Sequence, residues 1–253
     1  MPGTSTDTNL RGVKILFDEA SHVYSSTING NEIKYISGTT FIHKFFPEFD
    51  TDKIAPFSAK KEGCTVEEIK QKWKQIGIEA VTFGTRVHEV CEDTLLNRQI
   101  RNKPTTEKEK IVFKNAESIS KIIREKFRIL GVEKIVFDEN LKIAGTIDLF
   151  AQNNLGTYLI LDHKTNKSID FENKYGEKAL PPIEELDNCN FNTYTLQLNL
   201  YEFILRYSGY VPKDAKFKRA IIHHTTEQSK IIELPDYQEH IKNMVIYYLA
   251  NNK

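Results

Sequence analysis

The chain has 253 residues and carries 35 basic and 35 acidic side chains, so its formal charge is zero. This length can bury one substantial core, and the charge balance argues against a general nucleic-acid-coating protein without excluding a local basic groove. No apolar run reaches membrane-span length and no basic-then-apolar leader opens the sequence, so we expect no membrane contact. Cys64, Cys91 and Cys189 are isolated and no C-x-x-C pair occurs. A disulfide framework, a structural zinc site and a four-cysteine iron–sulfur cluster therefore lack support, and a reducing, intracellular (cytoplasmic) setting is favoured.

Turn residues and hydrophobic periodicity predict the elements of the first half of the chain. Asn29-Gly30 is a strong signal for a tight turn between two strands, and Thr39 or Thr40 supplies the N-cap of a short helix that Pro47 ends. After a disordered tail at 1–12, the expected elements are strands at 22–28 and 32–36 and helices at 41–46, 65–77, 84–97 and 107–131.

The second half alternates strands with helices and contains one long polar stretch. The expected elements are strands at 133–138, 143–151, 158–165, 217–223 and 230–234 and helices at 194–207 and 236–250. This order predicts an α/β (α+β) fold with a central mixed sheet flanked by helices. We divide the chain into the tail, an N-terminal hairpin and helical module at 13–79, and a core at 80–253. A polar stretch of this length is unusual in a compact domain, so we interpret 166–193 as a flap inserted into the core.

Two apolar runs, 143–151 and 158–165, each carry one acidic residue where a core residue belongs. If the turn between them is centred on Leu155, Asp148 lies opposite Asp162 on one face of a hairpin, roughly 5 Å apart at Cβ. Lys164 shares that face because side chains alternate along a strand. An Asp and a Lys at a strand end are commonly a surface salt bridge. Two acids in apolar surroundings repel each other at high cost, and a divalent cation is the simplest remedy.

Other polar residues are candidates for the same place. His88 lies beside the apolar stripe of its helix, Glu133 opens a strand, and Gln197 and Tyr201 share one side of a largely apolar helix. Each also has an ordinary interpretation: a core histidine, a solvated acid at a strand end, or a glutamine that faces water.

Five short motifs occur in order: G-x-x-x-H at 84–88, Glu133, G-x-x-D at 145–148, D-x-K at 162–164 and Q-x-x-x-Y at 197–201. In this respect the chain resembles the PD-(D/E)XK nuclease superfamily, in its RecB-like branch of phage and mitochondrial genome maintenance exonucleases. The resemblance covers about residues 80–225 and extends loosely to H-x-Y at 22–24. It implies a restriction-endonuclease-like core, and it implies an intracellular location that for a phage protein is the host cytoplasm. Relatives that carry an iron–sulfur cluster use four cysteines, so we expect none here.

The resemblance also implies roles for individual residues. The implied metal ligands are Asp148, Asp162, His88 and the carbonyl of His163; Lys164 is the implied catalytic lysine, and Gln197 and Tyr201 would shape the site and touch DNA. We expect Glu133 to be an outer contact to metal or water.

The reaction that such a site suits is phosphodiester hydrolysis with one or two Mg²⁺ or Mn²⁺ ions, which prefer oxygen ligands. We expect Lys164 to stay protonated between two carboxylates and to act electrostatically. Arg86 and Lys167 are placed to meet phosphates. We therefore predict a deoxyribonuclease. The resemblance, and the absence of a separate sequence-reading domain, imply an exonuclease that prefers single-stranded DNA ends. The alternatives are a structure-specific or restriction-like endonuclease on the same core and a non-catalytic nucleic-acid-binding module.

Overall fold

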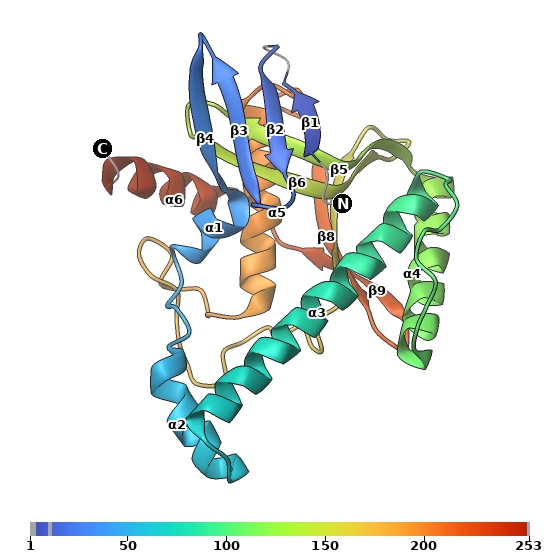
Figure 1. Ribbon diagram of the computed structural model, residues 1–253. Helices are drawn as coiled ribbons and strands as arrows, with labels where there is room; N and C mark the ends of the chain where they lie inside the picture. The colour runs from blue at the N-terminus through green and yellow to red at the C-terminus, as the bar shows by residue number, and fades with distance from the viewer. Residues whose placement is uncertain (1–3, 10–11, 252–253) are drawn as a thin grey trace.

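The structure is a computed structural model that describes residues 4–9 and 12–251 (Figure 1). Its elements, in chain order, are β1 (Thr4–Thr8), β2 (Lys14–Asp18), β3 (Val23–Ile28), β4 (Asn31–Ser37), α1 (Gly38–His43), α2 (Thr51–Glu62), α3 (Val66–Leu95), α4 (Glu107–Lys126), β5 (Arg128–Asp138), β6 (Ile143–Gln152), β7 (Tyr158–Lys164), α5 (Asn190–Tyr207), β8 (Phe217–His224), β9 (Ser229–Leu234) and α6 (Gln238–Asn251). Within the described ranges, no helix is both long and apolar enough to span a membrane. The predicted mixed α/β class, with a large mixed sheet flanked by helices, is confirmed.

One sheet contains all nine described strands, and β6 is its branch point. Strand β5 pairs antiparallel with β6 along its whole length. The opposite edge of β6 is shared: β4 pairs in parallel with its first two residues, and β7 pairs antiparallel with its last four. Between these two ladders, residues 145–148 of β6 have no strand partner on that edge among the described strands. Asp148 therefore lies where β4 and β7 part.

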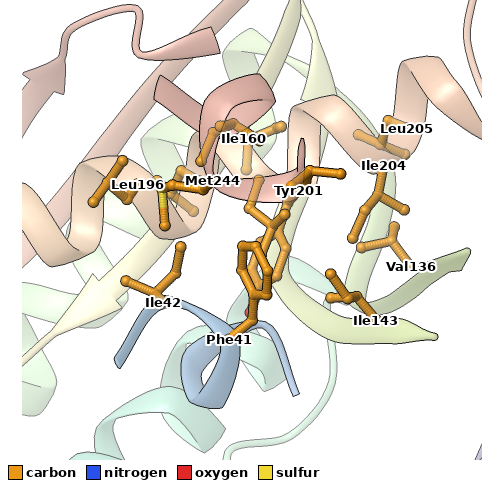
Figure 2. Packing of buried hydrophobic residues seen from close by; sticks show 14 of the residues in the cluster. Phe41, Ile42, Val136, Ile143, Ile160, Leu196, Tyr201, Ile204, Leu205 and Met244 are labelled. Carbon is orange, nitrogen blue, oxygen red and sulfur yellow. The ribbon is translucent and has the colours of Figure 1, made fainter. Parts of the chain in front are cut away.

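Helices cover both faces of the sheet. Helices α1, α5 and α6 pack on one face around the largest buried cluster, in which Figure 2 shows Tyr201 projecting beside Phe41. The other face carries the end of α3 and helix α4, whose Leu95 and Ile123 contact buried side chains of β6, β7 and β8. Each large apolar side chain buried in this way contributes about 1.5–3 kcal/mol, so both layers fix the position of the central strands.

Helix α3 is a single helix of 30 residues, where we predicted two helices, at 65–77 and 84–97. Thr65 and Glu68 form a capping box at its start. The helix runs across the molecule from α2 at one end to α4 at the other (Figure 1). Gly84 does not end it. A Cβ at Gly84 would lie 3.3 Å from the Thr165 hydroxyl, so this glycine lets α3 pass close to the end of β7.

Several other boundaries differ from the predictions. Residues 4–8 of the expected disordered tail form β1, which pairs with β2, whereas residues 1–3 and 10–11 of that tail lie outside the described residues. Ser37, and not Thr39 or Thr40, caps α1. Helix α2 was not predicted. Helix α4 ends at Lys126, and β5 then begins five residues earlier than the expected strand.

The segment 165–189 forms no helix and no strand, although every one of its residues is described, and a single bridge joins Lys178 to Asp187. It is nevertheless held in place. The side-chain amide of Asn173 donates to the carbonyl oxygen of Asn188. The N–H of Leu180 donates to the carbonyl oxygen of Phe45, just past the end of α1. The expected helix after this segment starts at Asn190, four residues earlier than predicted.

Candidate metal centre and catalytic site

The β6–β7 hairpin places the two predicted acids near enough for the charge of Asp162 to raise the pKa of Asp148. Its last paired residues are Leu149 and Leu161, which is the register expected from a turn centred on residue 155. Beyond this pair the strands part, and the N–H of His163 donates to Oδ2 of Asp148 over 2.7 Å. The side chains of Asp148 and Asp162 are buried at this point, with 8% and 3% of each residue exposed. The pairing of β6 with β7 therefore ends at the residues next to Asp148 and Asp162.

Lys164 lies between a carboxylate and an aromatic ring. Its Nζ is 2.5 Å from Oδ2 of Asp162 and 4.5 Å from the centre of the Tyr194 ring. Tyr194 is fixed in turn by its hydroxyl, which donates to Oδ1 of Asn166. Burial lowers the pKa of Lys164, but the charges of Asp162 and Asp148 more than compensate, so that the pKa is raised overall. The amine of Lys164 is therefore a cation at neutral pH. Tyr194 is part of this site, although none of the sequence motifs indicated it.

His88 reaches the same strand end from α3. Its Nε2–H donates to the carbonyl oxygen of His163 over 2.9 Å, a tautomer assigned because a carbonyl can only accept. Nδ1 of the same ring lies 3.4 Å from Oδ2 of Asp148. His88 and Asp148 therefore present possible ligand atoms side by side.

Glu133 completes the group from β5. The residues on either side of it, Val132 and Lys134, pair with positions 149 and 147 of β6, so Glu133 lies opposite Asp148. Its φ is +50°, a left-handed conformation that non-glycine residues rarely adopt and that is found at functional sites. Ligand atoms of Glu133, Asp148 and His88 all lie within 4.8 Å of one another. The predicted outer contact is therefore close enough to bind metal directly.

The site holds more negative than positive charge. Burial, and then the charge of Asp162, raise the pKa of Asp148 to about 6. Burial and the charge of Asp148 also raise the pKa of Glu133, although part of Glu133 stays exposed and solvent screens the effect. Among the described residues, Lys164 is the ammonium that pairs with these acids, through Asp162. A divalent cation would relieve this excess, and the donors present (carboxylates, a carbonyl and one imidazole) suit Mg²⁺ or Mn²⁺.

Helix α5 supports the site from one side. Nε2 of Gln197 lies 3.5 Å from Oδ1 of Asp162 and 3.2 Å from the hydroxyl of Tyr201, to which it donates. Tyr201 is 2% exposed, and a Cβ on Gly145 would clash with its ring. The glycine of G-x-x-D is therefore required so that β6 can lie against Tyr201. Tyr201 is a buried support and not the DNA contact that we expected.

The two predicted phosphate contacts differ in their surroundings. Arg86 donates to the carboxylate of Glu109 and to the carbonyl oxygen of Lys103, so its guanidinium joins α3 to α4 and is not free for a phosphate, contrary to the prediction. Lys167 is exposed just beyond β7 and forms no ion pair within the described part of the chain. Of these two residues, only Lys167 is still a candidate for phosphate binding.

Comparisons with known proteins add no assignment. No protein-family model matches the chain, and no curated protein sequence matches it significantly.

Proposed function

We propose that this chain is a metal-dependent deoxyribonuclease that hydrolyses phosphodiester bonds at single-stranded DNA ends, on a restriction-endonuclease-like core of the PD-(D/E)XK type. The observation that carries this proposal is the group of Asp148, Asp162 and Lys164 at the end of one hairpin, with His88 and Glu133 beside it. A structural salt bridge needs neither a second buried acid nor a third carboxylate.

Mg²⁺ or Mn²⁺ would be held by Asp148, Asp162, the carbonyl of His163 and His88. When bound, such an ion supplies a Lewis acid that makes water more acidic and withdraws charge from a phosphate. Asp148 keeps its ligand geometry through the N–H of His163, and Asp162 through Gln197. These partners orient the carboxylates before any substrate arrives.

The protein groups supply the remaining chemistry. The Lys164 ammonium, held on the Tyr194 ring, stabilises the negative charge that develops on the phosphate oxygens. Glu133 lies opposite Asp148 and is exposed to solvent, so its carboxylate would be placed to accept a proton from water once a bound cation keeps it ionised. Lys167, exposed past the strand end, is placed to bind a neighbouring phosphate.

Two adjoining hollows favour a single strand as the substrate. They measure about 410 and 580 Å³ and share His43, Asn188 and Thr193, at the start of α5 and the end of α1. The next residue after Thr193 is Tyr194, which contacts Lys164. The segment 165–189 borders the first hollow through residues 170–175. Neither hollow is lined by Asp148, Asp162 or Lys164, and we propose that an unpaired strand lies over the hollows on its way to these residues, because its bases can stack on aromatic side chains.

The proposal is tested with end-labelled linear and closed circular single strands, in Mg²⁺, Mn²⁺ or excess chelator. We expect cleavage of the linear strand alone, no cleavage in chelator, and a loss of at least about 10²-fold for Asp162→Ala and Lys164→Ala. Lys218→Ala, which removes an exposed ion pair with Glu233 on β8 and β9, is the matched control and should keep full activity.

The outcomes separate the alternatives. Efficient cleavage of the closed circle would replace the exonuclease with an endonuclease on the same core. Metal-independent cleavage, or full activity in both site variants, would refute the catalytic proposal. Binding of single strands without any cleavage under all metal conditions would leave the non-catalytic binding module.

A further inference from the structure

A second group of metal-binding side chains lies behind the acidic site, on the face of the sheet covered by α3 and α4. It consists of Cys91 from α3, His163 from β7 and His224 from β8, and each of the three is at most 2% exposed. Their ligand atoms all lie within 4.8 Å of one another. Nδ1 of His163 is 2.9 Å from Nε2 of His224, which is 3.8 Å from the Cys91 sulfur.

One buried polar atom at this group, Nε2 of His163, has no hydrogen-bond partner within the described structure. The hydroxyl of Ser120 lies against the Cys91 thiol. Buried polar groups are nearly always satisfied, and an exception commonly marks a bound water or ion. Nδ1 of His224, in contrast, is fixed by the hydroxyl of Ser229 over 2.7 Å. A hydrogen bond to the second ring nitrogen is the usual support of a histidine that ligates a metal.

We propose that Cys91, His163 and His224 bind one Zn²⁺ ion as its three protein ligands. One thiolate and two imidazoles form a borderline-soft set that Zn²⁺ prefers and that Mg²⁺ does not. Zinc–nitrogen bonds of about 2.0–2.1 Å in a tetrahedron separate two nitrogens by about 3.3 Å. The ion would therefore replace the hydrogen bond between the two imidazoles after a small movement of the rings.

The charge balance of the surroundings favours this ion. Binding exchanges the thiol proton of Cys91 for Zn²⁺, which leaves one net positive charge at the cluster. The carboxylates of Asp148 and Glu133 are near enough to influence the Cys91 thiol electrostatically, so they would offset that charge.

His163 connects the two sites. Its ring faces the cysteine and histidine cluster, while its carbonyl and N–H face His88 and Asp148. A zinc ion on the ring would therefore fix the backbone of β7 between the acidic ligand Asp162 and Lys164. The zinc site would act as a structural support directly behind the catalytic one, and its presence does not depend on any nuclease activity.

The test measures metal content and not catalysis. Protein produced with zinc and dialysed against metal-free buffer should retain about one zinc ion per chain. The cobalt form should show thiolate charge-transfer absorption in the near ultraviolet. Cys91→Ser and His224→Gln should lower retained zinc at least about tenfold, and Ser229→Ala should weaken zinc binding about 10–100-fold.

Two controls isolate the site. Cys189→Ser removes a buried cysteine at the start of α5, and Asp162→Asn impairs the acidic site; both should keep zinc and the cobalt spectrum. Negligible zinc in the unmodified protein, a cobalt spectrum without the thiolate band, or unchanged zinc in Cys91→Ser would overturn the proposal. If that variant does not fold by circular dichroism, Ser229→Ala decides: unchanged zinc affinity there would contradict the site.

Discussion

Replacing Asp148 by Asn should stabilise the metal-free protein while it abolishes activity. Asp148 is buried, and burial together with the charge of Asp162 raises its pKa from 3.8 to about 6. Asn has nearly the same shape and can still accept the hydrogen bond from the N–H of His163. The substitution therefore removes a charge that the folded state holds at a cost, without leaving a donor unsatisfied.

The magnitude follows from the shift of the pKa. The pKa of Asp148 differs by about 2 units between the folded and unfolded states. At about 1.4 kcal/mol per unit, the ionised Asp148 lowers the free energy of unfolding by at most about 3 kcal/mol near neutral pH. The pH dependence of stability has the opposite sign to that of most buried carboxylates. Here the folded state binds the proton of Asp148 more tightly than the unfolded state does. The cost is complete above about pH 6, shrinks as the pH falls, and vanishes below about pH 4.

The assay is urea or thermal denaturation in chelator, near pH 7 and near pH 4. We expect Asp148→Asn to raise the melting temperature by several degrees at the higher pH and to leave it unchanged at the lower. Mg²⁺ should then stabilise the unmodified protein, by about 2.7 kcal/mol at one hundred times its dissociation constant, but not the variant. A variant less stable than the unmodified protein near pH 7 would refute the reasoning.

Three further predictions address other parts of the site. Affinity for Mn²⁺, measured by titration calorimetry, should fall about tenfold per pH unit below about pH 6, because Asp148 must lose its proton to bind; a pH-independent affinity would contradict this. Tyr194→Leu should lower kcat by about 2–30-fold through the lost cation–π contact, with Mn²⁺ affinity unchanged, whereas an equal loss of affinity would point to general disruption. Gly145→Ala should destabilise the fold by about 1–3 kcal/mol in denaturation, because its Cβ meets the ring of Tyr201, and Tyr201→Leu should relieve part of that cost.

Features fixed by local rules could be predicted from the sequence. The Asn29-Gly30 turn joins β3 to β4 as expected, and the turn centred on Leu155 sets the register of β6 and β7. Side-chain alternation then places Asp162 and Lys164 together. These features depend on neighbours close along the chain, for which turn chemistry and strand periodicity are sufficient.

Features that depend on tertiary contact could not be predicted. The packing of Gly84 against Thr165 lets α3 continue where composition suggested a break, and Glu109 of α4 binds the guanidinium of Arg86. Tyr194 contacts Lys164 only because α5 folds back over β7. No sequence motif indicates such pairs, since the partners are brought together by the packing of whole elements.

The proposed zinc ligands could not be predicted from the sequence for the same reason. Cys91 and His224 are 133 positions apart, and His163 and His224 are 61 apart, so no spacing pattern reveals them. The lack of a C-x-x-C pair led to the expectation that structural zinc is unsupported. That expectation was drawn from ligands close along the chain and does not address ligands that the sheet assembles.

The most direct test of the catalytic centre is anomalous diffraction from crystals soaked in Mn²⁺. We predict a manganese peak within coordinating distance of carboxylate oxygens of both Asp148 and Asp162 and of the carbonyl oxygen of His163, at about 2.0–2.3 Å. A fully occupied soak with no peak between the two carboxylates, or with manganese bound to only one of them, would contradict the account.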